Sequence, residues 1–120
     1  MPGKNESLRD RLTRYRQIRI TVIGRISGRE ISMPVWFVLE DHALYLLPVQ
    51  GSETQWYKNV WKNPKMRIDA RGVANEVTAI PLTGPAQVKS VVEKFREKYG
   101  ASDVKKYYTK FDVAVRVDVP

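Results

Sequence analysis

The sequence contains no cysteine and only one histidine among its 120 residues. Without cysteine the chain can form neither disulfide bonds nor thiolate metal sites, and it has no thiol nucleophile. A metal site would therefore need carboxylates, and because no cluster of Asp and Glu has ligand spacing we predict none. The single histidine, His42, falls in a predicted hairpin turn, where a structural role is favoured over catalysis. An enzyme built from these residues would have to borrow its reactivity from a cofactor.

Long apolar runs are also missing, and no window approaches the length of a membrane span. The first residues are polar and charged, so we expect no signal peptide and a cytoplasmic protein. The phosphate-binding patterns G-x-x-x-x-G-K-S/T and G-x-G-x-x-G do not occur in the chain.

What the chain has in excess is positive charge, with 21 Lys and Arg against 13 Asp and Glu and a formal net charge of +8. The surplus is uneven, because eight basic residues but only two acidic ones fall within residues 1–29. Such a surplus attracts anions such as nucleic acid, phosphorylated cofactors or acidic lipid. An ordinary solvated basic face explains the bare count equally well.

The hydrophobic pattern predicts an α+β protein that is mainly β. Alternating, β-branched segments indicate strands at 18–23, 30–40, 43–49, 65–71, 75–83 and 111–119, and Pro34 predicts an edge or a bulge. Helical spacing indicates helices over 7–17, with Ser7 as N-cap, after the loop at Gly51, over 86–99 and near 102–109. We predict a six-stranded antiparallel sheet curled into a small barrel, with an N-terminal helix (1–17) and a single domain (18–120).

Two turns have the chemistry of anion sites. Backbone N–H groups around Ser27 and Gly28 can form an anion-binding concavity, flanked by the planar guanidinium groups of Arg25 and Arg29. The loop at Gly51–Ser52 precedes the short helix that contains Trp56, where free N–H groups and the helix dipole favour anions. Together they would suit a long, negatively charged ligand with a planar head. A plain turn with surface arginines is the alternative.

The chain resembles the deazaflavin-dependent nitroreductase family of split β-barrel proteins, relatives of FMN-binding and pyridoxamine-phosphate-oxidase-like barrels. The resemblance rests on ITVIGRISGREISMPVWFV and QGSETQWYKNVWKNPKMRI, which carry a G-R-x-S-G turn and a W-Y-x-N-x-x-x-N-P segment. It covers about residues 18 to 71 and implies an FMN-binding-like split barrel. It also implies an oxidoreductase that passes a hydride from the reduced F-420 coenzyme, an 8-hydroxy-5-deazaflavin, to a quinone, nitroaromatic or similar acceptor.

The resemblance implies a set of cofactor-binding residues. The phosphate and glutamate tail would face Arg25, Ser27, Gly28 and Arg29. The deazaflavin ring would lie along Pro34, Val35 and Trp36 and meet the backbone of Val49, Gln50 and Gly51. Trp56 and Tyr57 would brace the pocket, and Asn59 would cap or link it. On the acceptor side, Tyr107 and Tyr108 would orient or protonate the substrate, or would simply pack over the barrel.

Three departures from the family pattern keep alternatives open. Ile26 and Ile31 stand where the family often has Lys and Arg, and Gln50 stands where a lysine is common. The chain could therefore bind FMN instead, or act as a non-catalytic flavin-type carrier or sensor. A basic nucleic-acid-binding barrel is a third alternative, in which Trp36, Tyr45 and Trp56 would stack on bases. These aromatics fall in apolar runs typical of buried strands, so we expect no specific nucleic acid.

The N-terminal helix places Leu8, Leu12 and Tyr15 on one face among arginines. That pattern suits packing on its own domain or on a dimer partner, and less well an acidic bilayer surface. Split barrels of this type commonly pair, so the resemblance implies a homodimer. Peripheral membrane contact through the N-terminal helix is the less favoured expectation.

Overall fold

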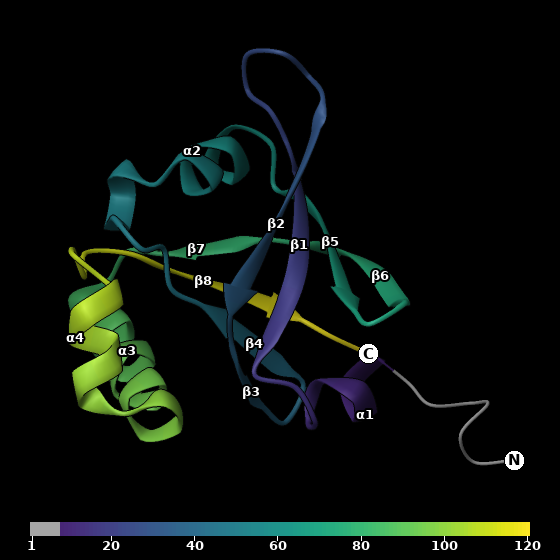
Figure 1. Ribbon diagram of the computed structural model, residues 1–120. Coiled ribbons are helices and arrows are strands. Elements are labelled where there is room, and N and C mark those ends of the chain that lie inside the picture. The colour runs from purple at the N-terminus through teal and green to yellow at the C-terminus, as the bar shows by residue number, and fades with distance from the viewer. Residues whose placement is uncertain (1–7) are drawn as a thin grey trace, which may run out of the picture.

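The structure is a computed structural model, which describes residues 8–120 (Figure 1). Its strands form two four-stranded antiparallel sheets with the orders β2-β1-β5-β6 and β3-β4-β8-β7. The strands are β1 Gln17–Ile23, β2 Glu30–Trp36, β3 Val38–Glu40, β4 Ala43–Leu46, β5 Lys65–Ala70, β6 Val73–Thr78, β7 Ile80–Leu82 and β8 Ala114–Asp118. The helices are α1 Leu8–Leu12, the 3-10 helix η2 Gly51–Glu53, α2 Gln55–Lys62, α3 Pro85–Tyr99 and α4 Ala101–Tyr107.

The α+β class and the antiparallel pairing are confirmed, but the predicted number of six strands is wrong. The segments 30–40 and 75–83 each break into two strands, at Phe37 and at Ala79. At each break the chain leaves the sheet that contains β1 and enters the sheet that contains β8. Within residues 8–120 the two sheets do not close into one continuous barrel. The alternation of apolar and polar residues could not reveal these breaks. A buried apolar residue at which the chain crosses from one sheet to the other looks like any other buried strand position in the sequence.

Side chains hold the first crossing where the ladder stops. Phe37 is fully buried, and its amide N–H donates to the Tyr99 hydroxyl at 3.1 Å. That hydroxyl lies 2.8 Å from the Phe37 carbonyl oxygen and 2.6 Å from the Arg16 carbonyl oxygen, one of which accepts its proton. Lys98 Nζ also donates to the Phe37 carbonyl, at 2.7 Å. The crossing is therefore satisfied by the last turn of α3 instead of by a neighbouring strand.

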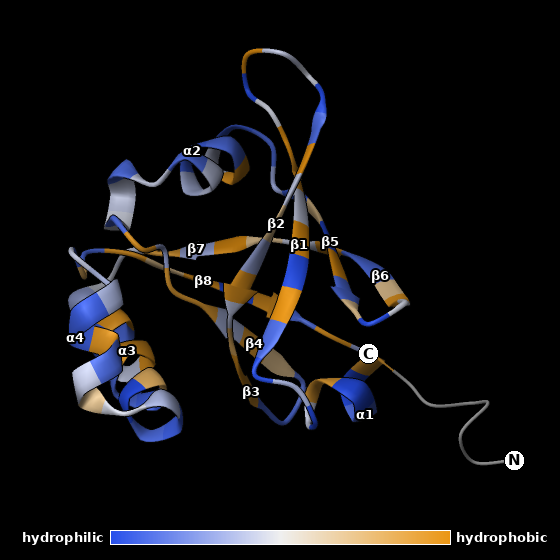
Figure 2. Cartoon of the chain, viewed as in Figure 1, coloured by the Kyte–Doolittle hydropathy of each residue, from blue (hydrophilic) through white to orange (hydrophobic). Residues whose placement is uncertain are grey.

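The second crossing uses the backbone alone, because the Ala79 N–H donates to the Pro64 carbonyl at 2.8 Å. One core cluster lies between the two sheets and includes α1 and α2, and a second lies between α3, α4 and the β3–β8 sheet. Figure 2 shows hydrophobic residues along the strands of both sheets and along α3. The helices thus fix the ends of β2, β4 and β8 relative to one another.

The N-terminal helix packs on its own domain. Leu8 and Leu12 are 2% and 1% exposed, and α1 lies against β5 and β6. Tyr15 packs on the same cluster under the Arg71 guanidinium, whose Cζ is 4.8 Å from the ring centroid. The apolar face that a bilayer would need is therefore already covered. The helix ends at Leu12, earlier than predicted. Its predicted N-cap, Ser7, lies outside the described residues. The predicted domain boundary at residue 17 stays a prediction.

β2 is an edge strand, as Pro34 predicted, and within residues 8–120 it pairs with β1 alone. The β1–β2 hairpin runs past α2 and ends in an open loop (Figure 1). In residues 8–120 no helix has both the length and the apolar composition needed to span a membrane.

Replacing Tyr99 with Phe should destabilise the fold by about 1–3 kcal/mol, because the buried Phe37 N–H loses its acceptor while the ring packing stays. Urea unfolding followed by circular dichroism measures the loss. Tyr45→Phe is the matched control, since that hydroxyl makes no hydrogen bond within the described residues and its loss should be nearly neutral. Equal effects of the two substitutions would show that the crossing does not depend on the hydroxyl.

Candidate functional site

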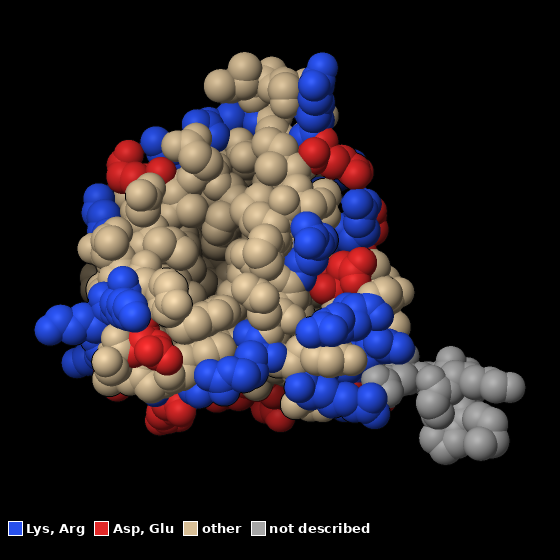
Figure 3. Space-filling view, viewed as in Figure 1, with Lys and Arg blue, Asp and Glu red and all other residues tan. Residues whose placement is uncertain are grey.

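A cavity of about 480 Å³ opens between β2, the loop after β4 and the end of α4. It has the size of a small-molecule site. Figure 3 shows the corresponding hollow near the centre of one face. Its walls are Gln17, Met33, Pro34, Val35, Trp36, Leu47, Val49, Thr54, Trp56, Tyr107 and Tyr108. None of these eleven side chains is charged, although the protein carries a net charge of +8. In Figure 3 the Lys and Arg side chains gather around the hollow and not within it.

Aromatic rings build one wall of the cavity. Trp36 stacks on Tyr99, with 4.2 Å between ring centroids and 8° between planes. Tyr107 meets Trp36 edge-on at 5.0 Å, and Tyr108 lies tilted at 6.1 Å. Because Tyr99 is held by the Phe37 crossing, the indole of Trp36 is fixed in one orientation. A flat, rigid aromatic wall of this kind suits a planar ligand.

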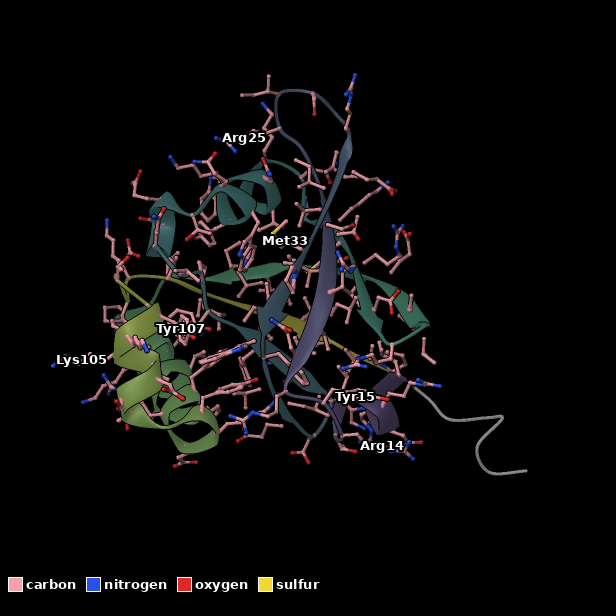
Figure 4. All side chains as sticks on the ribbon, viewed as in Figure 1. Arg14, Tyr15, Arg25, Met33, Lys105 and Tyr107 are labelled. Atoms are coloured by element: carbon pink, nitrogen blue, oxygen red, sulfur yellow. The ribbon has the colours of Figure 1, made fainter. Side chains whose placement is uncertain are left out.

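The two tyrosines of α4 differ in their surroundings. Tyr107 is 53% exposed, whereas Tyr108 is 5% exposed. Burial, and secondarily Tyr99, raises the pKa of Tyr108 well above its ordinary value, so that phenol stays neutral. Figure 4 shows Tyr107 and Met33 on opposite sides of the cavity, on α4 and β2 respectively. The phenol of Tyr107 is therefore accessible both to a ligand in the cavity and to solvent.

The hairpin turn lies apart from the cavity, because Arg25, Ser27, Gly28 and Arg29 are not among its lining residues. The turn itself is tight, with Gly28 at φ +72° and its N–H donating to the Gly24 carbonyl at 2.9 Å. Both isoleucines at the departures from the family pattern are exposed, Ile26 to 92% and Ile31 to 41%.

Arg25 binds its own protein. Its Nη1 donates to Asn59 Oδ1 at 2.8 Å and its Nη2 to Gln55 Oε1 at 2.8 Å. Asn59 is 4% exposed, and its Oδ1 also accepts from the Arg25 backbone N–H at 3.1 Å. Arg25 and Asn59 thus fasten the hairpin to α2 (Figure 4). Asn59 is a link, one of the two roles that the resemblance implied, and Tyr57 is a buried core residue beside it.

The second predicted anion site holds a carboxylate from the same chain. Asp112 Oδ1 accepts from the Ser52 N–H at 2.9 Å, and Oδ2 accepts from Ser52 Oγ at 2.5 Å. Gly51 has φ +56°, and a Cβ there would collide with Asp112 Oδ1. Desolvation raises the pKa of Asp112, but the Ser52 bonds and Lys110 outweigh it and hold the pKa below its ordinary value. Asp112 is therefore a bound anion.

The cavity also includes residues that the sequence did not single out. Gln17, Met33 and Leu47 line it, as does Thr54, whose Oγ1 accepts from the Gln50 N–H at 2.8 Å. Met33 and its neighbour Pro34 point to opposite faces of β2. Both can line the cavity because β2 is an edge strand. A smaller hollow of about 220 Å³ shares Gln17 and Pro34 but is polar and lined by charged groups, so it suits a planar apolar ligand less well. Within residues 8–120 no group of carboxylates and histidine is arranged to hold a metal ion.

Replacing Asn59 with Ala should destabilise the protein by about 1–3 kcal/mol, because it leaves the Arg25 N–H and guanidinium without their buried acceptor. Gln55→Ala, which removes only the exposed contact to the same guanidinium, should cost less than about 0.5 kcal/mol. Amide hydrogen exchange at residues 24–29 should speed up in the first variant only. Unchanged exchange there would show that the hairpin is held by other contacts.

Replacing Asp112 with Asn should destabilise the protein at pH 7, because the charge-assisted bonds to Ser52 are lost. A carboxyl with a lowered pKa stabilises the fold above its unfolded pKa, near 3.8, and this stabilisation is lost as the pH falls through the lower folded value. The difference between wild type and variant in urea unfolding should therefore shrink in strong acid. Asp118→Asn, at an exposed ion pair with Arg116, should change little at any pH.

Comparison with solved structures shows a shared fold. An F-420-H2 dependent reductase matches with a TM-score of 0.67 and 19% identity, over 86% of this chain and 94% of that one. HutZ, the heme storage protein from Vibrio cholerae, matches with 0.69 and 12%, over 94% and 87%. A pyridoxamine 5'-phosphate oxidase-like protein from Listeria innocua matches with 0.67 and 11%, over 89% and 86%. All share the split-barrel, FMN-binding-like fold, so the resemblance is confirmed at the level of the fold.

A further structure, described as a domain-swapped dimer, matches with a TM-score of 0.67 and 19% identity, over 86% of this chain and 80% of that one. No curated protein matches the chain significantly. A family model matches residues 10–117, nearly the whole of the described structure. The chain therefore belongs to the family described as "uncharacterized protein conserved in bacteria" (DUF2255).

Proposed function

We propose that the protein is an oxidoreductase that binds the F-420 coenzyme in the aromatic cavity and reduces a quinone, nitroaromatic or similar acceptor. One observation carries the proposal: seven residues predicted from the family resemblance line a single uncharged cavity. These residues are Pro34, Val35, Trp36, Val49, Trp56, Tyr107 and Tyr108. The fold shared with an F-420-H2 dependent reductase supports it.

The cavity fits the needs of hydride transfer. A reduced deazaflavin supplies two electrons as a hydride, and the protein must supply orientation and a dry, flat site. Trp36, fixed by Tyr99, and Pro34 on the edge strand would position the ring, and Trp56 and Val49 would exclude water from it. The acceptor also needs a proton, which the exposed Tyr107 hydroxyl would donate and then recover from solvent.

A non-catalytic flavin-type carrier or sensor is the second candidate, and specific observations favour it. Arg25 is bound to α2, and the Gly51–Ser52 turn is filled by Asp112, so two of the predicted phosphate contacts are taken. Ile26 and Ile31 add no charge. The same observations are compatible with FMN as the ligand, since a flavin ring needs the same flat wall.

The nucleic-acid alternative has less support. Trp56 is 6% exposed, and both Trp36 and Trp56 line an uncharged cavity, so neither ring lies along a basic groove. A homodimer stays a prediction, which the domain-swapped dimer among the structural matches supports. A cytoplasmic location stays a prediction as well.

The proposal is tested by titrating the protein with F-420 and, in parallel, with FMN, following cofactor fluorescence. Val49→Trp should reduce affinity at least about tenfold, because the larger side chain fills a cavity wall that is 43% exposed and need not disturb the core. Ile80→Trp, at a 41% exposed site outside the cavity, is the matched control and should bind normally.

Each outcome of the titration separates the candidates. Binding of F-420 with reduction of menadione or a nitroaromatic by the reduced coenzyme supports the oxidoreductase. Binding of either cofactor without turnover supports the carrier or sensor. If neither cofactor binds to the wild type, or if Val49→Trp binds as tightly as the wild type, the cavity is not the cofactor site.

A further inference from the structure

Two cations lie at the end of the aromatic wall, outside the sites predicted for anions. The Arg16 Cζ atom is 4.9 Å from the centroid of the Tyr99 ring, and Lys98 Nζ is 5.1 Å from the same centroid. Tyr99 in turn stacks on Trp36, which lines the cavity. Gln17, the residue after Arg16, lines the cavity too. The two positive charges therefore lie against Tyr99, one ring away from the cavity wall.

Neither cation has an acidic partner. Within residues 8–120, no carboxylate lies within ion-pair distance of Arg16 or of Lys98. The contrast within α3 is direct, because Lys94, one turn earlier, pairs with Glu40 at 3.4 Å. Lys98 instead donates to the Phe37 carbonyl and lies 3.7 Å from the centroid of the Phe37 ring. A partly buried lysine beside an arginine, with no counter-ion, is costly.

The electrostatics agree with a missing anion. Burial, and then the charge of Arg16, lowers the pKa of Lys98 to about 8. A bound oxyanion would relieve both effects, because it would accept hydrogen bonds from the two groups and offset their repulsion. The neighbouring phenol does not titrate in this range, since burial raises the pKa of Tyr99 to about 12.

Two of the groups predicted to bind anions, Arg25 and the Ser52 turn, are already occupied within the protein. The guanidinium of Arg25 is bonded to Gln55 and Asn59, and the Ser52 N–H and hydroxyl are bonded to Asp112. The cavity wall itself carries no charge. A planar ligand against Trp36 would therefore have two cations without an acidic partner, Arg16 and Lys98, beside the Tyr99 ring on which Trp36 stacks.

We propose that Arg16 and Lys98 form an oxyanion site at the end of the cavity, which holds the phosphate or carboxylate of a ligand whose planar part lies against Trp36. The part about the planar ligand rests on the proposed function, whereas the oxyanion site does not. The tail would then extend toward the start of β1 and the end of α3, away from the hairpin turn.

The site is tested first without any cofactor. The full chain, labelled with ¹³C at lysine Cε, is titrated with base by NMR in inorganic phosphate and in chloride at equal ionic strength. Phosphate should raise the pKa of Lys98 by at least about half a unit, because a bound anion favours the charged amine. Arg16→Ala should reduce that phosphate-dependent shift. Lys89, exposed on the same helix, is the internal control, and an equal response of Lys89 and Lys98 would overturn the site.

The second test compares F-420 with the same deazaflavin lacking phosphate and glutamates, and FMN with riboflavin. Wild type should prefer the anionic member of a pair, and Arg16→Ala or Lys98→Met should lower that preference about tenfold. Lys98→Arg should keep it, and Lys89→Ala should leave it unchanged. A preference seen only with F-420 assigns the site to the glutamate carboxylates, and one seen with FMN assigns it to phosphate.

The preference for the anionic ligand should also depend on pH in a defined direction. Lys98 loses its charge as the pH rises through about 8, while Arg16 stays charged and Tyr99 stays neutral, so the preference should fall between pH 7 and pH 9. In Lys98→Met this dependence should disappear. If a variant weakens charged and neutral ligands equally, Arg16 and Lys98 only support the Tyr99–Trp36 stack and the proposal is wrong. If the wild type binds no ligand of either pair, the proposed function fails, and the phosphate titration alone decides the oxyanion site.

Discussion

The Tyr99 hydroxyl at the Phe37 crossing is the contact on which the rest of the arrangement depends. A chain that moves from one sheet to another must leave the hydrogen-bond ladder, and each backbone group that leaves it needs a new partner. Here α3 supplies the partners through its last turn. The same tyrosine fixes Trp36, so a requirement of the fold also determines the orientation of the cavity wall. Fold and site cannot be altered separately at this position.

Apolar side chains line the cavity, and charged side chains lie outside it. The walls are aromatic and aliphatic, and the basic side chains stay at the rim, where water still solvates most of them. Such a division favours a ligand whose flat part and charged part are distinct. The two loops predicted to bind anions make these contacts within the protein instead. Arg25 fastens the hairpin to α2, and Ser52 fastens the loop before α2 to Asp112. Both contacts stiffen the walls that face the cavity.

The sequence predicted the class of fold, the edge strand with Pro34 and most of the cavity wall. It did so because alternation and turn residues are local properties, and because the resemblance covered the segments that form β2 and α2. It missed the breaks at Phe37 and Ala79 and the role of Asp112. These depend on partners far along the chain, Tyr99 for Phe37 and Ser52 for Asp112. It also assigned Arg25 to a ligand, since nothing local shows that a guanidinium is already bonded to Asn59.

Pro34 has a consequence beyond the cavity. β2 lies at the open edge of its sheet, where a row of free N–H and C=O groups would template the addition of another strand. Proline has no N–H to offer, so this edge is interrupted in the middle of the strand. The residue that shapes the cavity wall therefore also protects the chain against edge-to-edge aggregation, and a substitution that improved ligand contacts there would expose the sheet to it.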